Sequence, residues 1–447
     1  MEATLLGRFM DILIPIETAS RELLYKVHIS RLLALQGYNC YIGSKTQIYM
    51  LLGFFSNYIY LDKGYHPASS DNLYKIIKKN NGIIVSLDEE GAVDYSNGST
   101  LQRRYSEVLF NKVDFAFLWG QKIYELIQDN IIDKSKVKIS GHPRFELLKP
   151  KFQYLYSSDV KIIKEKYGKF ILINTNMGFG NNIKGDEFVI NNYEDRFPEI
   201  KNIIDFDKEK LNLFCQLVTK LSTSTDLNII FRPHPEEDNS FYIRAFAGLS
   251  NVKIIYEKSV IPWLIACEKM IHPDCTTAIE AFFLGKEPIS LLPGNSLNAR
   301  ITKLPLNVST KFNRVEHVIK YLETKNVQKE NTSKEKMQLI EDYFSYSMPT
   351  IEIIINQLGL IKENISHAEK NKILIRHFIH LKIRTIIPYF KRKKTSTKLR
   401  DNKLEGFNIN NITFDYRDSL NEKGLDVINC KELNSELFYF SKKIYNC

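Results

Sequence analysis

The chain lacks the short motifs by which several large enzyme classes are recognised. It contains no GxxxxGK(S/T) phosphate loop, no GxGxxG opening a helix, no GxSxG elbow and no HExxH. In each motif the glycines or the reactive side chains carry the chemistry of the class. P-loop hydrolysis of nucleoside triphosphates, nicotinamide redox chemistry, serine hydrolysis and zincin chemistry are therefore disfavoured.

Cysteine is also scarce and scattered. The 447 residues include six cysteines, without a CxxC pair or zinc-finger spacing. This distribution argues against a disulfide scaffold and a zinc module. The start of the chain has no signal-peptide pattern, and no apolar run reaches the roughly 18 to 20 residues of a membrane span. We expect a cytoplasmic protein, either free or peripheral on the inner face of the plasma membrane.

The positive charge is mostly dispersed along the chain. The net charge is +10 and the isoelectric point is near 9.0. No zinc finger, RRM or other nucleic-acid signature accompanies this charge, so we expect no nucleic-acid partner. One segment, residues 373–400, combines apolar residues with a concentrated basic run. It is typical of an amphipathic helix on an anionic membrane, although a solvated linker helix explains it nearly as well.

Short apolar runs alternate with helical patterns. The run from Asp11 to Ile16 precedes helical spacing from Arg21 to Gln36 and a second run from Asn39 to Ile42. A strand, a helix and a strand in this order predict a parallel sheet, and the pattern recurs. The further expected strands are 58–61, 83–87, 115–119, 137–140, 170–174, 228–231, 252–255, 269–272 and 288–292. The further expected helices are 70–80, 121–129, 209–222, 260–266, 276–284 and one long helix, 334–358.

This rhythm predicts an α/β fold of two tandem Rossmann-like domains with a C-terminal helical and basic tail. Ligands of such folds bind at the carboxyl ends of the strands, so residues at strand tips are the site candidates. The expected parts are a first domain at 1–150, a helical linker at 151–168, a second domain at 169–325 with a polar insertion at 178–208, closing helices at 326–360, and the basic tail at 361–447.

Two strand tips in the second half carry the strongest signal. The run 228–231 ends in Arg232-Pro233-His234-Pro235-Glu236-Glu237, and the run 269–272 ends in His272-Pro273-Asp274-Cys275-Thr276-Thr277. Proline cannot donate a hydrogen bond within a sheet, so Pro233 marks where the chain leaves the sheet. A helix that opens with hydroxyls and unpaired N–H groups suits a phosphate. The pattern therefore indicates a nucleotide-sugar site.

Ordinary structural roles would explain these donor-site candidates too. Arg232 could pair with a surface carboxylate, and His234 could cap a turn. Thr276 and Thr277 are common N-cap residues, and Glu280 could complete a capping box. In a nucleotide-sugar enzyme the same helix start would receive phosphate and Glu280 would reach a ribose hydroxyl. Both interpretations stay open on the sequence alone.

Further candidate substrate contacts lie at other strand tips. Asn174 and Asn176 follow the run 170–174 and could bind a sugar or a phosphate, or simply form a turn. Arg21 opens the first predicted helix, and Arg144 ends the segment Gly141-His142-Pro143-Arg144. Arg144 could contact an anionic group, and Arg21 is a further candidate for a substrate contact.

The candidate catalytic residues are the acids of the first half: Glu17, Asp88, Glu89 and Glu90. A carboxylate at a strand tip could take a proton from an acceptor hydroxyl as general base. The acid triplet could equally hold a divalent ion or form a solvated loop, and Glu17 could complement a helix dipole. The pattern requires no metal and no cofactor, and we expect none.

At these positions the chain resembles the bacterial surface carbohydrate biosynthesis protein family, whose members come from capsule and lipopolysaccharide clusters and are GT-B-like. The resemblance covers about residues 10 to 360 and leaves the tail outside. Parts of it are also similar to Kdo transferases and to CDP-glycerol glycerophosphotransferases. The family usually reads Gly-Asn-Pro-Arg where this chain has His142. The matching segments are Ile12–Glu17, Arg21–Leu23, Tyr41–Gly43, Leu87–Gly91, Trp119–Gly120, Gly141–Arg144, Ile173–Asn176, Arg232–Glu236 and His272–Ala281.

The resemblance implies a GT-B glycosyltransferase of surface polysaccharide biosynthesis, acting in capsule or O-antigen assembly. It would transfer a sugar from a nucleotide-sugar donor, with a CMP-linked acidic sugar as the leading case, to a glycan or lipid-linked acceptor. One alternative is a sugar-nucleotide 2-epimerase, which consumes a UDP-sugar without an acceptor. Another is a non-catalytic scaffold of a polysaccharide assembly complex. Bound nucleotide identity distinguishes the three.

Overall fold

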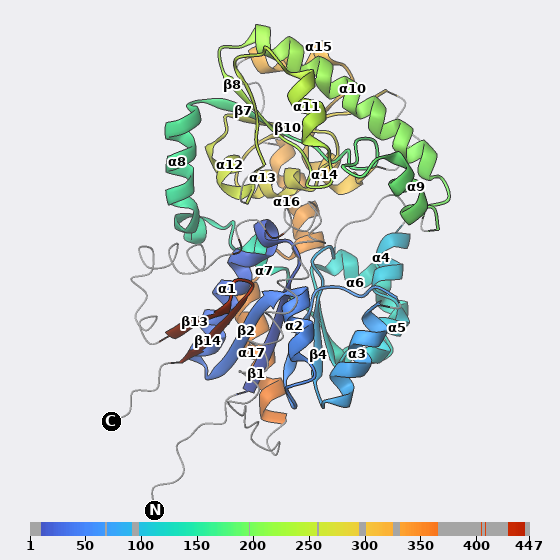
Figure 1. Ribbon diagram of the computed structural model, residues 1–447, viewed down its shortest axis with the longest axis vertical. Coiled ribbons are helices and arrows are strands. Elements are labelled where there is room, and N and C mark those ends of the chain that lie inside the picture. The colour runs from blue at the N-terminus through green and yellow to red at the C-terminus, as the bar shows by residue number, and fades with distance from the viewer. Residues whose placement is uncertain are drawn as a thin grey trace, which may run out of the picture. The chain divides into compact units, whose positions relative to one another are not determined.

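The computed structural model describes residues 10–67, 69–91, 98–195, 197–256, 259–294, 301–324, 331–364, 404, 407 and 428–442. The chain divides into two compact units, each built around one sheet (Figure 1). Unit 1 comprises Met1–Ala92, Leu101–Leu147 and Ile340–Cys447, and unit 2 comprises Val93–Thr100 and Leu148–Leu339.

Unit 1 contains an eight-stranded sheet in the order β13-β14-β2-β1-β3-β4-β5-β6. The six strands from β2 to β6 run parallel and are largely buried, as expected for strands covered on both faces. The direction of strand addition reverses between β1 and β3, which places the topological switch point there. The six are β1 (Met10–Ile16), β2 (Tyr38–Ser44), β3 (Ile59–Asp62), β4 (Ile83–Leu87), β5 (Phe115–Leu118) and β6 (Val137–Ile139).

Helices connect these strands and follow them in the chain. Among the helices before residue 148, α1 has the most buried residues. These helices are α1 (Ala19–Leu35), α2 (Lys45–Leu51), α3 (Ser69–Lys79), α4 (Ser99–Arg104), α5 (Glu107–Lys112), α6 (Gln121–Ile127) and α7 (Pro143–Glu146), with 3-10 turns η1 (Gln128–Asn130) and η2 (Lys134–Lys136).

A C-terminal hairpin, β13 (Ile428–Asn434) and β14 (Leu437–Lys442), extends the sheet of unit 1. β14 pairs antiparallel with β2, and its Leu437 and Phe438 are fully buried. Gly43 of β2 is needed here, because a Cβ atom at this position would lie 2.8 Å from Leu437 Cδ1 and 2.9 Å from the carbonyl oxygen of Glu436. The sequence analysis predicted no strand in this part of the chain.

Unit 2 contains a six-stranded parallel sheet in the order β12-β11-β10-β7-β8-β9. This is the doubly wound Rossmann order, and its switch point lies between β7 and β10. The strands are β7 (Phe170–Asn174), β8 (Asn228–Arg232), β9 (Val252–Ile254), β10 (Lys269–His272), β11 (Pro288–Leu291) and β12 (Thr310–Phe312). Its helical segments are η3 (Pro150–Tyr156), α8 (Ser157–Tyr167), α9 (Asp186–Tyr193), α10 (Ile200–Ser224), α11 (Asn239–Ala245), α12 (Ile261–Ala266), α13 (Thr277–Phe283), α14 (Lys303–Val308) and α15 (Val315–Glu323).

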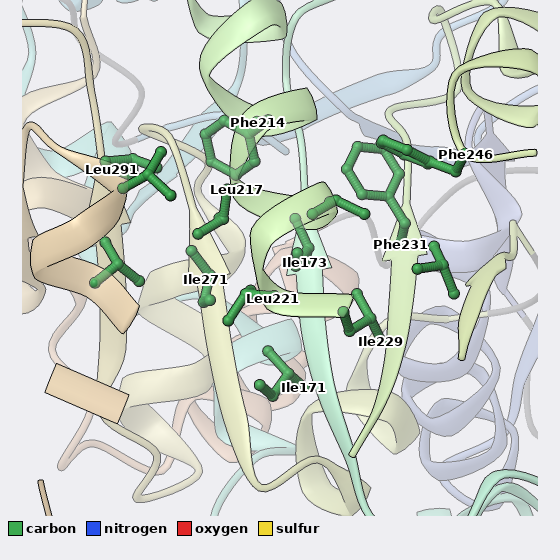
Figure 2. Close-up of a cluster of buried hydrophobic side chains, with 14 of the residues drawn as sticks. Ile171, Ile173, Phe214, Leu217, Leu221, Ile229, Phe231, Phe246, Ile271 and Leu291 are labelled. Carbon is green, nitrogen blue, oxygen red and sulfur yellow. The ribbon is translucent and has the colours of Figure 1, made fainter. Parts of the chain in front are cut away.

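The core of unit 2 packs α10 against one face of its sheet (Figure 2). Phe214, Leu217 and Leu221 of α10 lie over the odd-numbered residues of β7, Ile171 and Ile173. Successive side chains of a strand point to opposite faces. Asn174 at the end of β7 therefore points to the other face, where α12 packs, as the contact between Phe170 and Trp263 also shows (ring centroids 6.0 Å apart).

The predicted fold class is confirmed: each unit is an α/β domain whose sheet has six parallel strands, β2 to β6 in unit 1 and β12 to β9 in unit 2. The strands predicted at 83–87, 170–174 and 269–272 match residue for residue. The single helix predicted at 334–358 is wrong, because Ser345 takes a positive φ and Pro349 follows, so that α16 (Asn331–Phe344) and α17 (Thr350–Asn364) are separate. The insertion predicted as polar chain holds α9 and the first turns of α10.

Candidate functional site

Three predicted site residues form a row at the carboxyl edge of the sheet in unit 2. Asn174 is paired in register with Arg232 of β8, and His272 of β10 follows Ile271, which is paired with Ile173. Residues in register on parallel strands point to the same face. Arg232, Asn174 and His272 therefore stand side by side at the topological switch point, where ligands of such sheets bind.

The side chains of Arg232 and His272 both contact other residues of unit 2. The guanidinium of Arg232 lies 5.1 Å from the ring centroid of Trp263, a cation–π geometry. His272 Nε2 lies 2.8 Å from Ser309 Oγ, and its Nδ1 accepts the backbone N–H of Cys275 at 3.2 Å. Burial lowers the pKa of His272 to about 3, so the ring is neutral. His272 thus positions the loop that begins at Pro273.

His234 is the exposed histidine of the loop that follows β8. Its Nδ1 accepts the backbone N–H of Glu236 at 3.3 Å. Because Nδ1 acts as the acceptor, the neutral ring carries its proton on Nε2. His234 can therefore donate a hydrogen bond to an anionic oxygen in either protonation state.

The buried carboxylate of Glu237 organises this loop. Its Oε1 accepts the backbone N–H groups of Met177 (2.9 Å) and His234 (3.2 Å), and the hydroxyls of Thr175 and Tyr242 also donate to the group. One side chain thereby ties the loop after β7 to the loop after β8. Burial raises the pKa of Glu237 to about 7, although the four donors oppose this shift.

We expect Glu237→Gln to remove a pH dependence of stability. A carboxyl with a folded pKa near 7 and an ordinary value of 4.5 stabilises the fold most below pH 4.5, and the contribution is lost as pH rises through 7. The loss amounts to about 3 kcal/mol. Glutamine keeps Oε1 for the two N–H groups, and its amide can donate to the rotatable hydroxyls. Urea unfolding from pH 5 to 8 should show a flatter profile in the variant, and equal slopes would contradict the assignment.

Two further buried carboxylates hold the loop after β7. Asp274 accepts the Nδ2 of Asn176 at 3.0 Å, and Asp207 of α10 accepts the backbone N–H of Phe179 at 3.1 Å. Lys210 bridges them, with its Nζ 2.7 Å from Asp207 and 3.4 Å from Asp274. Carboxylates from separate elements thus fix this loop beside the loop of His234.

The start of α13 contains the other donor-site candidates. Thr276 is the N-cap residue of α13, but its side chain is exposed and makes no capping hydrogen bond. The Thr277 hydroxyl lies 3.2 Å from Cys275 Sγ. Glu280 is buried on the first turns of the helix. Thr276 is therefore the member of this group that is open to a ligand.

In unit 1 the switch point carries an internal carboxylate. Glu22 of α1 accepts the backbone N–H groups of Glu17 (3.2 Å) and Thr18 (3.0 Å). Burial alone would raise the pKa of Glu22, but the cations Lys26 and Lys63 lower it well below its usual range. A carboxylate thus occupies the N–H groups that hold phosphate in dinucleotide-binding units. This turn of unit 1 is unsuited to a nucleotide phosphate.

The three acids after β4 form ion pairs with different cations. Asp88 is buried and accepts Arg104 Nη1 at 3.0 Å, and buried Glu89 lies 2.9 Å from Lys26 Nζ. Glu90 contacts Arg104 at 2.6 Å and keeps 42% of its side chain exposed. Among the described residues no three His, Cys, Asp or Glu side chains converge as a metal-ligand group. Glu90 is the accessible acid of the triplet.

Glu17 and Arg21 of unit 1 are accessible, as Glu90 is. Glu17 Oε2 lies 2.8 Å from Lys63 Nζ and 3.5 Å from Lys45 Nζ. Arg21 Nη1 lies 3.6 Å from Glu90 Oε1. About a third of each of the Glu17 and Arg21 side chains is exposed.

His142 lies close to Glu89 of the acid triplet, and Arg144 follows two residues later. Burial and the charge of Arg144 lower the pKa of His142 well below its usual value. His142 Nδ1 accepts the N–H of Arg144, so Nε2 carries the proton and faces Glu89 Oε2 at 3.8 Å. The Arg144 guanidinium lies 4.7 Å from the Phe145 ring centroid. Arg144 is therefore an aromatic-packed cation in this structure.

Several central residues of both units were not among the sequence candidates. Glu22 and Lys26 stand four residues apart on α1, a spacing that predicts an ion pair but not its burial. Glu237 lies inside the quoted motif, where no spacing rule marks it as the organiser. Lys63, Asp207 and Lys210 gain their roles through contacts distant in the chain, with Glu17, Phe179 and Asp274 respectively.

The membrane expectation concerns residues 373–400, which lie outside the described residues. Across the ranges that the structure describes, no helix combines the length and apolar character of a membrane span.

The chain matches no protein-family model and no curated protein. Among solved structures, a histidine-to-alanine variant of the wall teichoic acid polymerase TagF has a TM-score of 0.51 and 10% identity, over 80% of this chain and 90% of that chain. The UDP-GlcNAc 2-epimerase of Neisseria meningitidis, bound to UDP-GlcNAc, has a TM-score of 0.47 and 13% identity, over 78% and 100%. The epimerase of Methanocaldococcus jannaschii has a TM-score of 0.44 and 11% identity, over 74% and 99%. The likeness to TagF shows a shared GT-B-like fold, and at this identity it shows the fold alone.

Proposed function

We propose that the protein is a GT-B glycosyltransferase of surface polysaccharide biosynthesis. It transfers a sugar from a nucleotide-sugar donor, with CMP-linked sugars as the first candidates, to a growing glycan. The observation that carries the proposal is the rim of unit 2, where the exposed His234 follows β8 beside the row of Arg232, Asn174 and His272 at the switch point.

The proposal assigns the leaving phosphate to unit 2. The Nε2–H of His234 and the exposed Thr276 hydroxyl donate to its oxygens, which stabilises the charge that develops as the bond to the sugar breaks. Glu280 is assigned to a ribose hydroxyl. His272 and Glu237 act as positioning residues, because their bonds fix the two loops.

The acceptor is assigned to unit 1. Its hydroxyl oxygen forms the new bond to the sugar carbon, and its proton passes to a carboxylate as the nucleotide departs with both bonding electrons. Among the acids, Glu17 and Glu90 are accessible, whereas Asp88 and Glu89 are buried. Glu17 and Glu90 are therefore the proposed bases, and the buried pair holds the rim in place.

Nucleotide-induced thermal shifts test this function. We expect CMP or CDP at about 100 times Kd to stabilise the protein by about 2.7 kcal/mol, with or without EDTA. Transfer of label from a CMP-sugar to an acceptor glycan would then establish the reaction. Stabilisation by UDP, with conversion of a UDP-sugar in the absence of acceptor, would establish an epimerase instead. Absence of binding by any nucleotide would contradict an enzymatic role.

A further inference from the structure

We propose that Asn174 forms a hydroxyl-binding subsite at the switch point of unit 2. The inference rests on the proposed function and adds to it the chemistry of one ligand group: an aliphatic hydroxyl, either of the nucleotide ribose or of the group that is transferred.

The first observation is a buried amide oxygen that lacks a hydrogen bond. Asn174 is 4% exposed, and its Oδ1 has no partner in the part of the chain that the structure describes. Most buried polar atoms in folded proteins are hydrogen-bonded, because desolvation without a partner is costly. An unmet acceptor at the ligand-binding edge of a sheet indicates a partner that is absent from the polypeptide.

The neighbours in the row do not complete this bond. On one side, the Arg232 guanidinium lies over Trp263. On the other side, both ring nitrogens of His272 are engaged, by Ser309 and by the backbone of Cys275. Asn174 therefore lies between two side chains that are turned to other contacts.

The loop after Asn174 is fixed, so the chain cannot easily relax to supply a donor. Thr175 and Met177 are tied to the buried Glu237, and the Asn176 Nδ2 is tied to Asp274. A carboxylate only accepts, so Asp274 also fixes which end of the Asn176 amide is the oxygen. That oxygen is a second buried acceptor without a partner among the described residues.

The chemistry of these oxygens defines the ligand group. An amide oxygen accepts hydrogen bonds and is repelled by the acceptor-only oxygens of a phosphate. The buried Oδ1 of Asn174 therefore suits a hydroxyl rather than the phosphate, which the proposed function places at His234 and Thr276. Hydroxyl groups are the donors that a nucleotide-linked sugar carries in abundance.

The test measures stability and ligand affinity in the same variants. Asn174→Leu removes an unmet acceptor at similar volume, so the free protein should keep or raise its Tm. Its affinity for CDP or CDP-glycerol should fall about tenfold, as expected for one lost hydrogen bond. Asn174→Ala is the second variant, should leucine not fit. The matched control is Asn228→Leu at the opposite end of β8, where Nδ2 bonds to the Tyr167 carbonyl at 2.8 Å. That control should lose stability and keep its affinity.

The ligand arms identify the source of the hydroxyl. If 2′,3′-dideoxy-CDP binds wild type as weakly as CDP binds the Asn174 variants, the subsite holds the ribose. If the variants bind CDP normally and lose affinity for CDP-glycerol alone, it holds the transferred group. Unchanged affinity for both ligands, with wild type binding them, would overturn the inference and leave the proposed function standing. Failure of wild type to bind any nucleotide would overturn both.

Discussion

Alanine in place of His234 is expected to lower the transfer rate by about 10² to 10³-fold, the usual effect of removing one donor to a developing negative charge. The ring is exposed and its Nδ1 accepts the N–H of Glu236 two residues away, a local contact, so the fold should survive the change. Initial rates with a CMP-linked donor, with a thermal melt of the same preparation, would measure both properties. The backbone N–H that binds Glu237 is unaffected by the substitution.

His317 provides a matched control for this variant. It is an exposed histidine on α15 of the same unit, so His317→Ala removes an equal ring without touching the rim. We expect it to retain wild-type transfer. A His234→Ala protein with unreduced rates would contradict the phosphate role, and equal losses in the two variants would indicate a nonspecific cause.

Methionine in place of Lys26 is expected to destabilise the protein by about 3 to 5 kcal/mol, because it breaks a buried ion pair by removing one partner. Lys26 Nζ lies 2.8 Å from Glu22 Oε2 and 2.9 Å from Glu89 Oε1, and all three side chains are buried. In the variant, Glu22 still has the cations Lys63 and Arg21 nearby, at longer distances. Glu89 keeps its hydrogen bond from the Tyr25 hydroxyl.

The free energy of unfolding in urea measures this effect, with Lys122→Met as the control. Lys122 pairs with Glu125 on α6 with both side chains nearly half exposed, so its loss should leave the free energy of unfolding nearly unchanged. A cost below about 1 kcal/mol for Lys26→Met would show that the buried cluster is not held by this lysine.

Much of the fold could be predicted because local composition determines it. The strands that match residue for residue are apolar runs that end at polar or turn residues, which is the signal of a buried parallel strand. The same property located the strand tips, and with them the rim at β7, β8 and β10. Pro349 marked the break between α16 and α17 by a local rule as well, but the helical spacing on both sides obscured it.

The function of individual side chains depended on contacts that sequence spacing does not encode. Asp88 and Glu89 belong to the same motif as Glu90, yet they are buried and pair with Arg104 and Lys26 of other elements, whereas 42% of the Glu90 side chain stays exposed. The sequence of strand β13 is mostly polar because the strand lies at the sheet edge, where only the first of its seven residues is buried.

The C-terminal hairpin constrains the order in which the two units can complete their folding during synthesis. The Tyr439 hydroxyl of β14 donates to Asn39 of β2, a residue translated 400 positions earlier. During synthesis, the edge of β2 that pairs with β14 therefore stays unpaired until the whole of unit 2 has left the ribosome. Unit 2 can fold as it leaves the tunnel, but unit 1 cannot be finished until translation has passed β14. Chaperones that bind nascent chains should accordingly stay bound longer to the N-terminal part of unit 1 than to unit 2.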